Sequence, residues 1–123
     1  MNKNIILIGM PASGKSTIGV NLAKAFGMSF IDTDLLIQNN EKRLLQDIID
    51  KDGLKSFLIA EEKALLSVRA DNSIISTGGS AIFSEKGMLE LKNNGIVVFI
   101  NLSLPVILKR LKNIKTRGIA MSK

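Results

Sequence analysis

Residues 9–17 read GMPASGKST and directly follow the apolar run Ile5–Ile8. This stretch fits the pattern G-x-x-x-x-G-K-[ST], in which a strand leads through a glycine-rich loop into a helix. Glycines let the loop N–H groups curl toward phosphate oxygens, and the helix N-terminus adds partial positive charge beside the same anion. The ammonium of Lys15 suits the outer phosphates, and the hydroxyl of Ser16 suits Mg²⁺. The stretch therefore predicts a nucleotide-phosphate site.

Strands alternate with helices along the rest of the sequence. The sequence predicts strands at residues 4–8, 29–31, 73–76 and 96–100. Helical spacing of apolar residues predicts helices at about 15–26, 35–37, 44–52, 54–69, 84–93 and 105–111. This alternation predicts a single α/β domain over residues 1–123, with three α/β/α layers around a parallel sheet. Ligands in that architecture lie at the carboxyl ends of the strands.

Two further segments fall at predicted strand ends, beside the phosphate loop. Asp32-Thr33-Asp34 follows the strand at 29–31, and Thr77-Gly78-Gly79 follows the strand at 73–76. If this segment is extended, Asp32 and Asp34 face the same side. One acid then holds Mg²⁺ near Ser16, and the other accepts a hydrogen bond from a substrate hydroxyl. The alternative is a helix N-cap, which Asp or Thr before a helix also provides.

Composition excludes several kinds of chemistry. The chain has 123 residues and contains neither histidine nor cysteine, so imidazole catalysis and thiolate or imidazole metal sites are excluded. Apolar runs stay far below the roughly 20 residues of a membrane span, so we expect no membrane association. The first ten residues do not form a secretory signal, and a cytoplasmic location is the default expectation.

A formal net charge of +6 raises the possibility of a nucleic-acid partner. However, the lysines are scattered, and the sequence has no Tyr or Trp on which bases could stack. Much of the excess charge lies in residues 109–123. We therefore expect a nucleotide and a small-molecule substrate as partners, and no nucleic acid.

At this point the motifs resemble those of a known family. GMPASGKSTIG, FIDTD, STGG and a basic segment ending in Thr116-Arg117 occur in the order and spacing of the shikimate kinases. The resemblance extends over essentially the whole chain. It implies a P-loop kinase fold of the nucleoside-monophosphate-kinase type, with ATP and Mg²⁺ as cofactors. The reaction it implies is phosphorylation of a hydroxyl on a small cyclic acid.

The resemblance also implies roles for individual residues. The nucleotide-binding residues of the loop are Gly9, Ala12, Ser13, Gly14, Lys15, Ser16 and Thr17. Arg110 resembles the residue that packs on adenine, and Arg117 resembles the arginine of an ATP lid that begins in residues 112–123. The lid accounts for the basic charge of this segment.

At the reacting end, the resemblance makes Lys15 and Asp34 the catalytic residues. Ser16 and Asp32 serve the metal, with Asp32 acting indirectly. Asp34 and the backbone of Gly78 and Gly79 contact the acceptor.

Three positions depart from the family pattern. Leu58 stands where the motif Phe-Arg-x-x-Glu has the arginine that grips the substrate carboxylate. Losing that charge-assisted hydrogen bond weakens acid binding roughly 10- to 150-fold. Ser80 replaces a third glycine, and Gly118 follows Arg117 where the lid usually has proline.

Family members continue beyond the lid with a further substrate arginine, a strand and a closing helix. We therefore expect either a fragment or an enzyme without this closure, with the final strand and helix missing. Residues 96–100 then lie toward an uncovered sheet edge, which predicts self-association.

Two classes of function stay open. The first is an ATP-dependent kinase, with shikimate as the first candidate acceptor and a polyol or sugar acid as a variant. The second is a nucleotide-binding module without turnover. Asp34 favours the first class, whereas Leu58 favours lost or altered specificity.

Overall fold

A computed structural model describes residues 3–9 and 14–100 of the chain. The described elements are β1 (Asn4–Gly9), α1 (Lys15–Phe26), β2 (Ser29–Asp32), α2 (Thr33–Glu41), α3 (Leu45–Ser67), β3 (Ser73–Ser76), the short 3₁₀ helix η1 (Ala81–Phe83), α4 (Glu85–Lys92) and β4 (Gly95–Ile100). All four strands were predicted at these places. The helix predicted at about 105–111 and the lid at 112–123 lie outside the described residues.

The four strands form one parallel sheet in the order β2-β3-β1-β4. In β1, Ile6 and Leu7 are completely buried on opposite faces of the sheet. A strand buried on both faces has an apolar residue at nearly every position, which explains the continuous run that opens the sequence. The predicted parallel α/β fold is confirmed.

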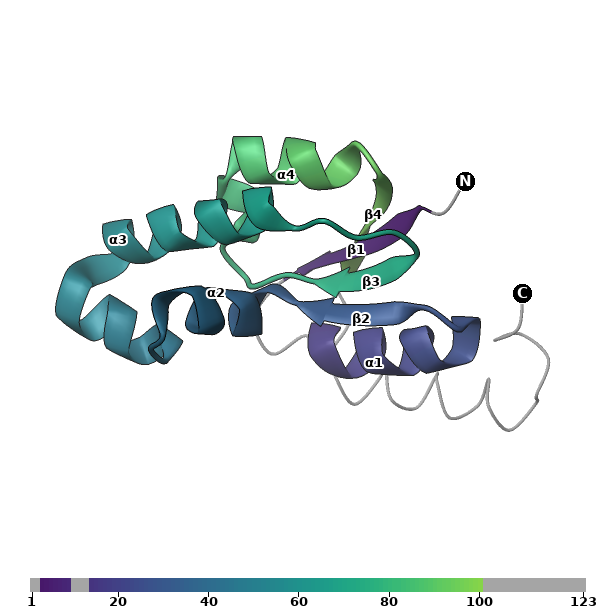
Figure 1. Cartoon of the computed structure of the whole chain (residues 1–123), viewed down its shortest axis with the longest axis horizontal. Helices are drawn as coiled ribbons and strands as arrows, with labels where there is room; N and C mark the ends of the chain where they lie inside the picture. The colour runs from purple at the N-terminus through teal and green to yellow at the C-terminus, as the bar shows by residue number, and fades with distance from the viewer. Residues whose placement is uncertain (1–2, 10–13, 101–123) are drawn as a thin grey trace.

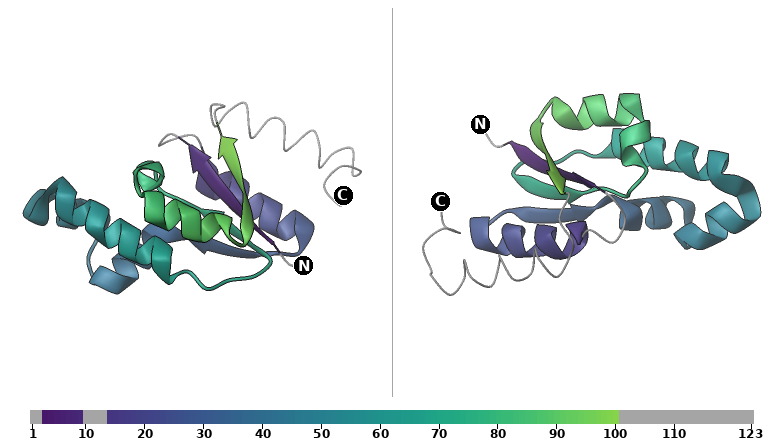
Figure 2. Two further views of the ribbon diagram at one scale, coloured as in Figure 1. Left: turned by 90° about the horizontal axis from the view of Figure 1, so that it is seen from above. Right: turned by 180° about the vertical axis from the view of Figure 1, so that it is seen from behind.

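Helices cover both faces of the sheet (Figures 1 and 2). On one face, Leu7 and Ile74 pack against Ile18 and Ala23 of α1. On the other face, the sheet packs against residues of α3, η1 and α4; the fully buried members are Ile6, Leu65, Ile75 and Ala81, and Leu91 is 5% exposed. The three predicted layers are therefore confirmed.

Helix α2 and the first half of α3 extend past the sheet, on the side where β2 ends (Figure 1). A third apolar cluster, which includes Ile37, Ile48 and Phe57, joins these two helices. Within α3, Gly53 has a φ of 90° and a ψ of 166° and breaks the helix. The sequence predicted two helices separated near Gly53, and this break is confirmed. The 3₁₀ helix at Ala81–Phe83 was not predicted.

Strand β4 is one of the two outer strands among the four described, β2 being the other, and it pairs with β1. The side chains of Ile96 and Phe99 are 56% and 55% exposed. The predicted position toward an edge is confirmed for the described strands, and self-association through it stays a prediction. In the part of the chain that the structure describes, no helix is both long and apolar enough to cross a bilayer.

Candidate active site

The phosphate-loop residues that the structure describes lie where β1 ends and α1 begins. Gly14 precedes α1 with a φ of 87°, a left-handed conformation that favours glycine. Because Gly14 has no side chain to cap the helix, the N–H groups at the start of α1 can serve an anion. Gly9 ends β1, and a Cβ there would lie 2.4 Å from the carbonyl oxygen of Ile100. Ala12 and Ser13 lie outside the described residues.

Lys15 reaches back across the loop. Its side chain is buried, and its Nζ donates a 2.8 Å hydrogen bond to the carbonyl oxygen of Gly9. Burial lowers the pKa of Lys15, and the negative charge of Asp34 partly opposes this shift. The ammonium is thus held at the loop, close to where the outer phosphates of a nucleotide would lie.

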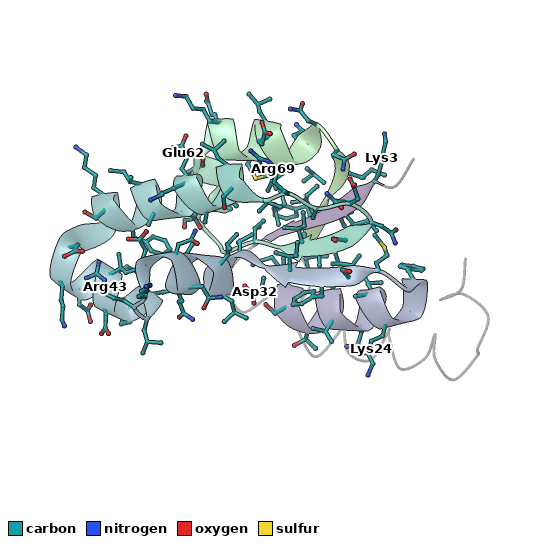
Figure 3. The ribbon with its side chains drawn as sticks, viewed as in Figure 1. Lys3, Lys24, Asp32, Arg43, Glu62 and Arg69 are labelled. Carbon is teal, nitrogen blue, oxygen red and sulfur yellow. The ribbon has the colours of Figure 1, made fainter. Side chains whose placement is uncertain are left out.

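Ser16 and Asp32 meet at the ends of α1 and β2. The hydroxyl of Ser16 donates to Asp32 Oδ2 at 3.2 Å and lies 3.4 Å from the hydroxyl of Ser76. The other oxygen of Asp32, Oδ1, accepts a 2.9 Å hydrogen bond from the backbone N–H of Asp34 and caps α2. Asp32 therefore provides the N-cap considered above and also contacts Ser16; Figure 3 shows it at the junction of β2 and α2.

These two oxygen-bearing side chains fit Mg²⁺, which prefers hard oxygen ligands. In residues 3–9 and 14–100, no group of three or more acidic side chains could form a metal cage. Mg²⁺ usually keeps several waters and binds through one or two protein oxygens together with substrate phosphates. A pair of Ser16 and Asp32 is consistent with that mode of binding.

Asp34 is not in the extended segment that the sequence suggested. Helix α2 begins at Thr33, so Asp34 lies in its first turn, and the argument that alternation aligns the two acids is wrong. The tertiary structure nevertheless brings Asp34 to the phosphate loop. Burial raises the pKa of Asp34, the charge of Asp32 raises it further, and Lys15 lowers it.

One cavity of about 330 Å³ collects most of the predicted residues. The phosphate loop and the start of α1 form one side, and Asp34 with the loop after β3 forms the other. Its lining residues are Gly14, Lys15, Ser16, Thr17, Asp34, Thr77, Gly78 and Gly79. Arg110 and Arg117, predicted to contact the nucleotide, lie outside the described residues.

The loop after β3 is fixed to the sheet by Thr77. Both the N–H and the hydroxyl of Thr77 donate to the carbonyl oxygen of Leu7, at 3.1 Å and 2.8 Å. The next residue, Gly78, passes so close to two acids that a Cβ there would lie 2.6 Å from Asp34 Oδ1 and 3.2 Å from Glu61 Oε2. A larger residue at position 78 would therefore have to displace the carboxylate of Asp34.

Glu61 was not predicted as a site residue. It lies on α3, is 1% exposed, and its Oε1 accepts a 2.8 Å hydrogen bond from Ser80. Burial raises the pKa of Glu61; the Ser80 hydrogen bond opposes the shift, and the nearby charge of Asp34 adds to it. The signal was present in the sequence, because Phe57, Glu61 and Leu65 are spaced four apart on the buried face of α3.

A larger cavity of about 430 Å³ lies at the opposite ends of the strands, around Asn4 and Asn94. Its main polar groups hold the fold together. Asn4 bonds the carbonyl of Ala70 and the N–H of Ser73, and Asn94 bonds the same carbonyl and Asp71. The nucleotide motif does not reach this end.

Comparison with known proteins agrees with this arrangement. The family model for shikimate kinase matches residues 11–123. The chain belongs to the shikimate kinase family. Shikimate kinase 2 of Yersinia pseudotuberculosis (strain YPIII) is 34% identical over 111 residues, which cover 90% of this chain and 64% of that relative.

Solved structures of shikimate kinases share the fold. The enzyme from Acinetobacter baumannii in complex with shikimate has a TM-score of 0.76 and 30% identity, covering 97% of this chain and 67% of that one. The shikimate kinase from Aquifex aeolicus has a TM-score of 0.73 and 34% identity, covering 85% and 63%. The chain thus spans about 64% of the length of the curated shikimate kinase that it matches.

Proposed function

We propose that this protein transfers the γ-phosphoryl group of ATP to a hydroxyl of a small metabolite, with shikimate as the acceptor and shikimate 3-phosphate and ADP as products. One observation carries the proposal. The 330 Å³ cavity is lined both by phosphate-loop residues and by Asp34, so a phosphate donor and a hydroxyl acceptor would meet in one space. Holding two reactants together in this way removes much of the barrier to transfer.

Each end of the cavity has its own task. The N–H groups at the start of α1 and the ammonium of Lys15 hold the phosphates. Asp34 accepts the hydrogen bond of the acceptor hydroxyl and takes its proton as the phosphoryl group moves. Ser16 and Asp32 would hold Mg²⁺, which offsets the negative charge of the phosphates when bound. Arg110 and Arg117 remain proposed contacts of the nucleotide.

A second candidate is a kinase for a polyol or sugar acid. Leu58 favours it, because it removes a cation from the acceptor side of the site. Lys15 is the only cation among the described residues that line the cavity, and it is placed at the phosphate loop. Nucleotide binding without turnover is the third outcome that an experiment must separate.

Calorimetry and a transfer assay on the 123-residue chain test these alternatives. We expect the chain to bind Mg²⁺–ATP, then shikimate, and to form shikimate 3-phosphate. Lys15→Ala should reduce transfer roughly 100- to 1,000-fold, in line with the loss of one group that stabilises developing charge. Lys24→Ala, an exposed lysine on the same helix (Figure 3), is the matched control and should leave transfer unchanged.

The possible results separate the candidates. Nucleotide binding without transfer to shikimate or to any polyol would support a binding module. Transfer to a sugar acid but not to shikimate would support the second candidate. Unchanged nucleotide affinity in Lys15→Ala, with no transfer by the wild type, would contradict the kinase proposal.

A further inference from the structure

Ser76 places a hydroxyl at a position where the sheet otherwise buries apolar side chains. It ends β3, is 1% exposed, and pairs in register with Leu7 of β1 and Asp32 of β2. Because side chains alternate along a strand, Ser76 lies on the same face of the sheet as Ile74, which packs against α1. A buried hydroxyl costs free energy unless it forms a hydrogen bond, so the partner of Ser76 bears on its role.

Among the residues that the structure describes, the hydrogen-bond partner of Ser76 Oγ is Ser16. Their Oγ atoms are 3.4 Å apart, and Ser16 also donates to Asp32 Oδ2 at 3.2 Å. A serine hydroxyl has one proton and two lone pairs. Because the proton of Ser16 is directed at Asp32, Ser76 is the donor to Ser16 Oγ. The two contacts use the proton and one lone pair of Ser16, so one lone pair remains.

The remaining lone pair of Ser16 is the one that can serve a ligand. Ser16 lines the 330 Å³ cavity, whereas Ser76 does not. Ser76 and Asp32 end neighbouring strands of the sheet, so the sheet fixes both partners of Ser16 relative to each other. An oxygen that is held by two such partners keeps one orientation, as ligands of metal sites do when outer residues bond them.

We propose that Ser76 is a positioning residue for the metal site assigned above to Ser16 and Asp32, an inference that rests on the proposed function. Ser76 donates its proton to Ser16 Oγ and so directs the remaining lone pair of Ser16 to the place where Mg²⁺ would accompany the phosphates. A separation of 3.4 Å is long for two hydroxyls, and we expect it to shorten when nucleotide and metal bind.

A packing role for Ser76 is the competing explanation. Serine is small, and α1 packs on this face of the sheet through Ile18 and Ala23. In that case the size of Ser76 matters and its hydroxyl does not. Alanine, which is nearly as small, would then replace it with no effect on metal binding.

Calorimetry separates the two explanations without any phosphate transfer. The affinity of the 123-residue chain for a non-hydrolysable ATP analogue is measured in saturating Mg²⁺ and again in EDTA. The ratio of the two affinities gives the coupling between metal and nucleotide. Ser76→Ala should lower this ratio roughly 3- to 10-fold, the effect of one neutral hydrogen bond, and should leave the affinity in EDTA unchanged.

Ser73→Ala is the matched control. Ser73 begins the same strand, is 3% exposed, and its hydroxyl donates to the carbonyl oxygen of Asp71, away from the phosphate loop. This variant loses a buried hydroxyl of the same kind and should keep the wild-type ratio.

A double-mutant cycle tests whether Ser76 acts through Ser16. Ser16→Ala should itself lower the ratio, and adding Ser76→Ala should lower it by less than about twofold more, because the oxygen that Ser76 positions is gone. The same further loss in both backgrounds would overturn the inference. A Ser76→Ala variant with the wild-type ratio would overturn it too, as would a wild type whose nucleotide affinity does not depend on Mg²⁺.

The proposed function fails in a different way. A chain in which Mg²⁺ raises nucleotide affinity through Ser76, but which transfers no phosphate, would keep the inference and contradict the kinase proposal. Transfer by the wild type together with an unchanged ratio in Ser76→Ala would keep the kinase proposal and overturn the inference.

Discussion

The two sides of the cavity differ in how their polar groups are paired. On the nucleotide side, Lys15 bonds the Gly9 carbonyl, and Ser16 bonds Asp32, so the described polar side chains already hold one another in place. On the acceptor side, Glu61 keeps an unpaired buried oxygen beside Asp34. Burial raises the pKa of Glu61, the hydrogen bond from Ser80 opposes this shift, and the charge of Asp34 adds to it.

The difference suggests where specificity arises. The paired side chains of Lys15, Ser16 and Asp32 suit phosphate and metal, which all kinases of this type bind. On the acceptor side, Asp34 and Gly78 line the cavity, whereas Glu61 lies next to Gly78 and does not line it. Substitutions on the two sides should therefore have separable effects on nucleotide affinity and on acceptor preference.

The largest expected effect is on the acceptor side, at Asp34. Asp34→Asn removes the proposed base and should lower the rate of transfer roughly 100- to 10,000-fold, with nucleotide affinity nearly unchanged. Calorimetry with ATP and a coupled transfer assay measure the two quantities. Asp50→Asn, at an exposed position on α3, is the control. An equal loss of nucleotide affinity in Asp34→Asn would show that the two sides are not separable.

Gly78→Ala should lower transfer by roughly 100-fold, because the new Cβ would push Asp34 and Glu61 out of place. Gly27→Ala is the control for backbone strain. Gly27 has a φ of 66° but nothing within 4 Å of an added Cβ, so this change should cost about 1–2 kcal/mol of stability and leave transfer unaffected. A Gly78→Ala variant with normal kinetics would contradict the close approach seen here.

Leu58→Arg should strengthen acceptor binding, whereas the two preceding substitutions should weaken transfer. An arginine at this position places a cation one turn from Glu61 and should tighten binding of shikimate roughly 10- to 150-fold. The methyl ester of shikimate lacks the negative charge and should gain much less. Leu58→Met keeps the volume and is the control. Equal gains for acid and ester would mean that the arginine does not act on the carboxylate.

The smallest expected effect is on the pH dependence of the free energy of unfolding. Because the pKa of Glu61 is raised in the folded state, its stabilising contribution is complete below the ordinary glutamate pKa of about 4.3. That contribution is lost as pH rises through the raised value. Relative to the wild type, Glu61→Gln should therefore gain stability as the pH rises above the ordinary glutamate pKa.

Urea midpoints at several pH values measure this difference, and Glu62→Gln should keep the wild-type slope. Asp34 adds to the same pH dependence of stability, because its pKa is also raised. It is unchanged in the wild type, Glu61→Gln and Glu62→Gln, so it does not affect their difference. Parallel slopes for the wild type and Glu61→Gln would mean that Glu61 is charged at the same pH in the folded and unfolded chains.

The sequence by itself determined the strand order along the chain, the start of α1 at Lys15, the break in α3 at Gly53 and the group of residues at the strand ends. These features depend on local physics: a buried parallel strand is apolar throughout, and glycine adopts backbone conformations that other residues avoid. For the same reason, Asp32 was recognised as a possible cap from its position alone.

The tertiary structure decided what the local pattern could not. It placed Asp34 in a helix rather than in an extended segment, and brought Glu61, Gly78 and Ser80 together although 19 positions separate Glu61 from Ser80. Such contacts depend on how α3 packs over the sheet, and local spacing carries no measure of distance between segments remote in sequence. Nine consecutive residues are enough to recognise the phosphate loop. The contacts among Asp34, Glu61 and Gly78 form only in the folded chain.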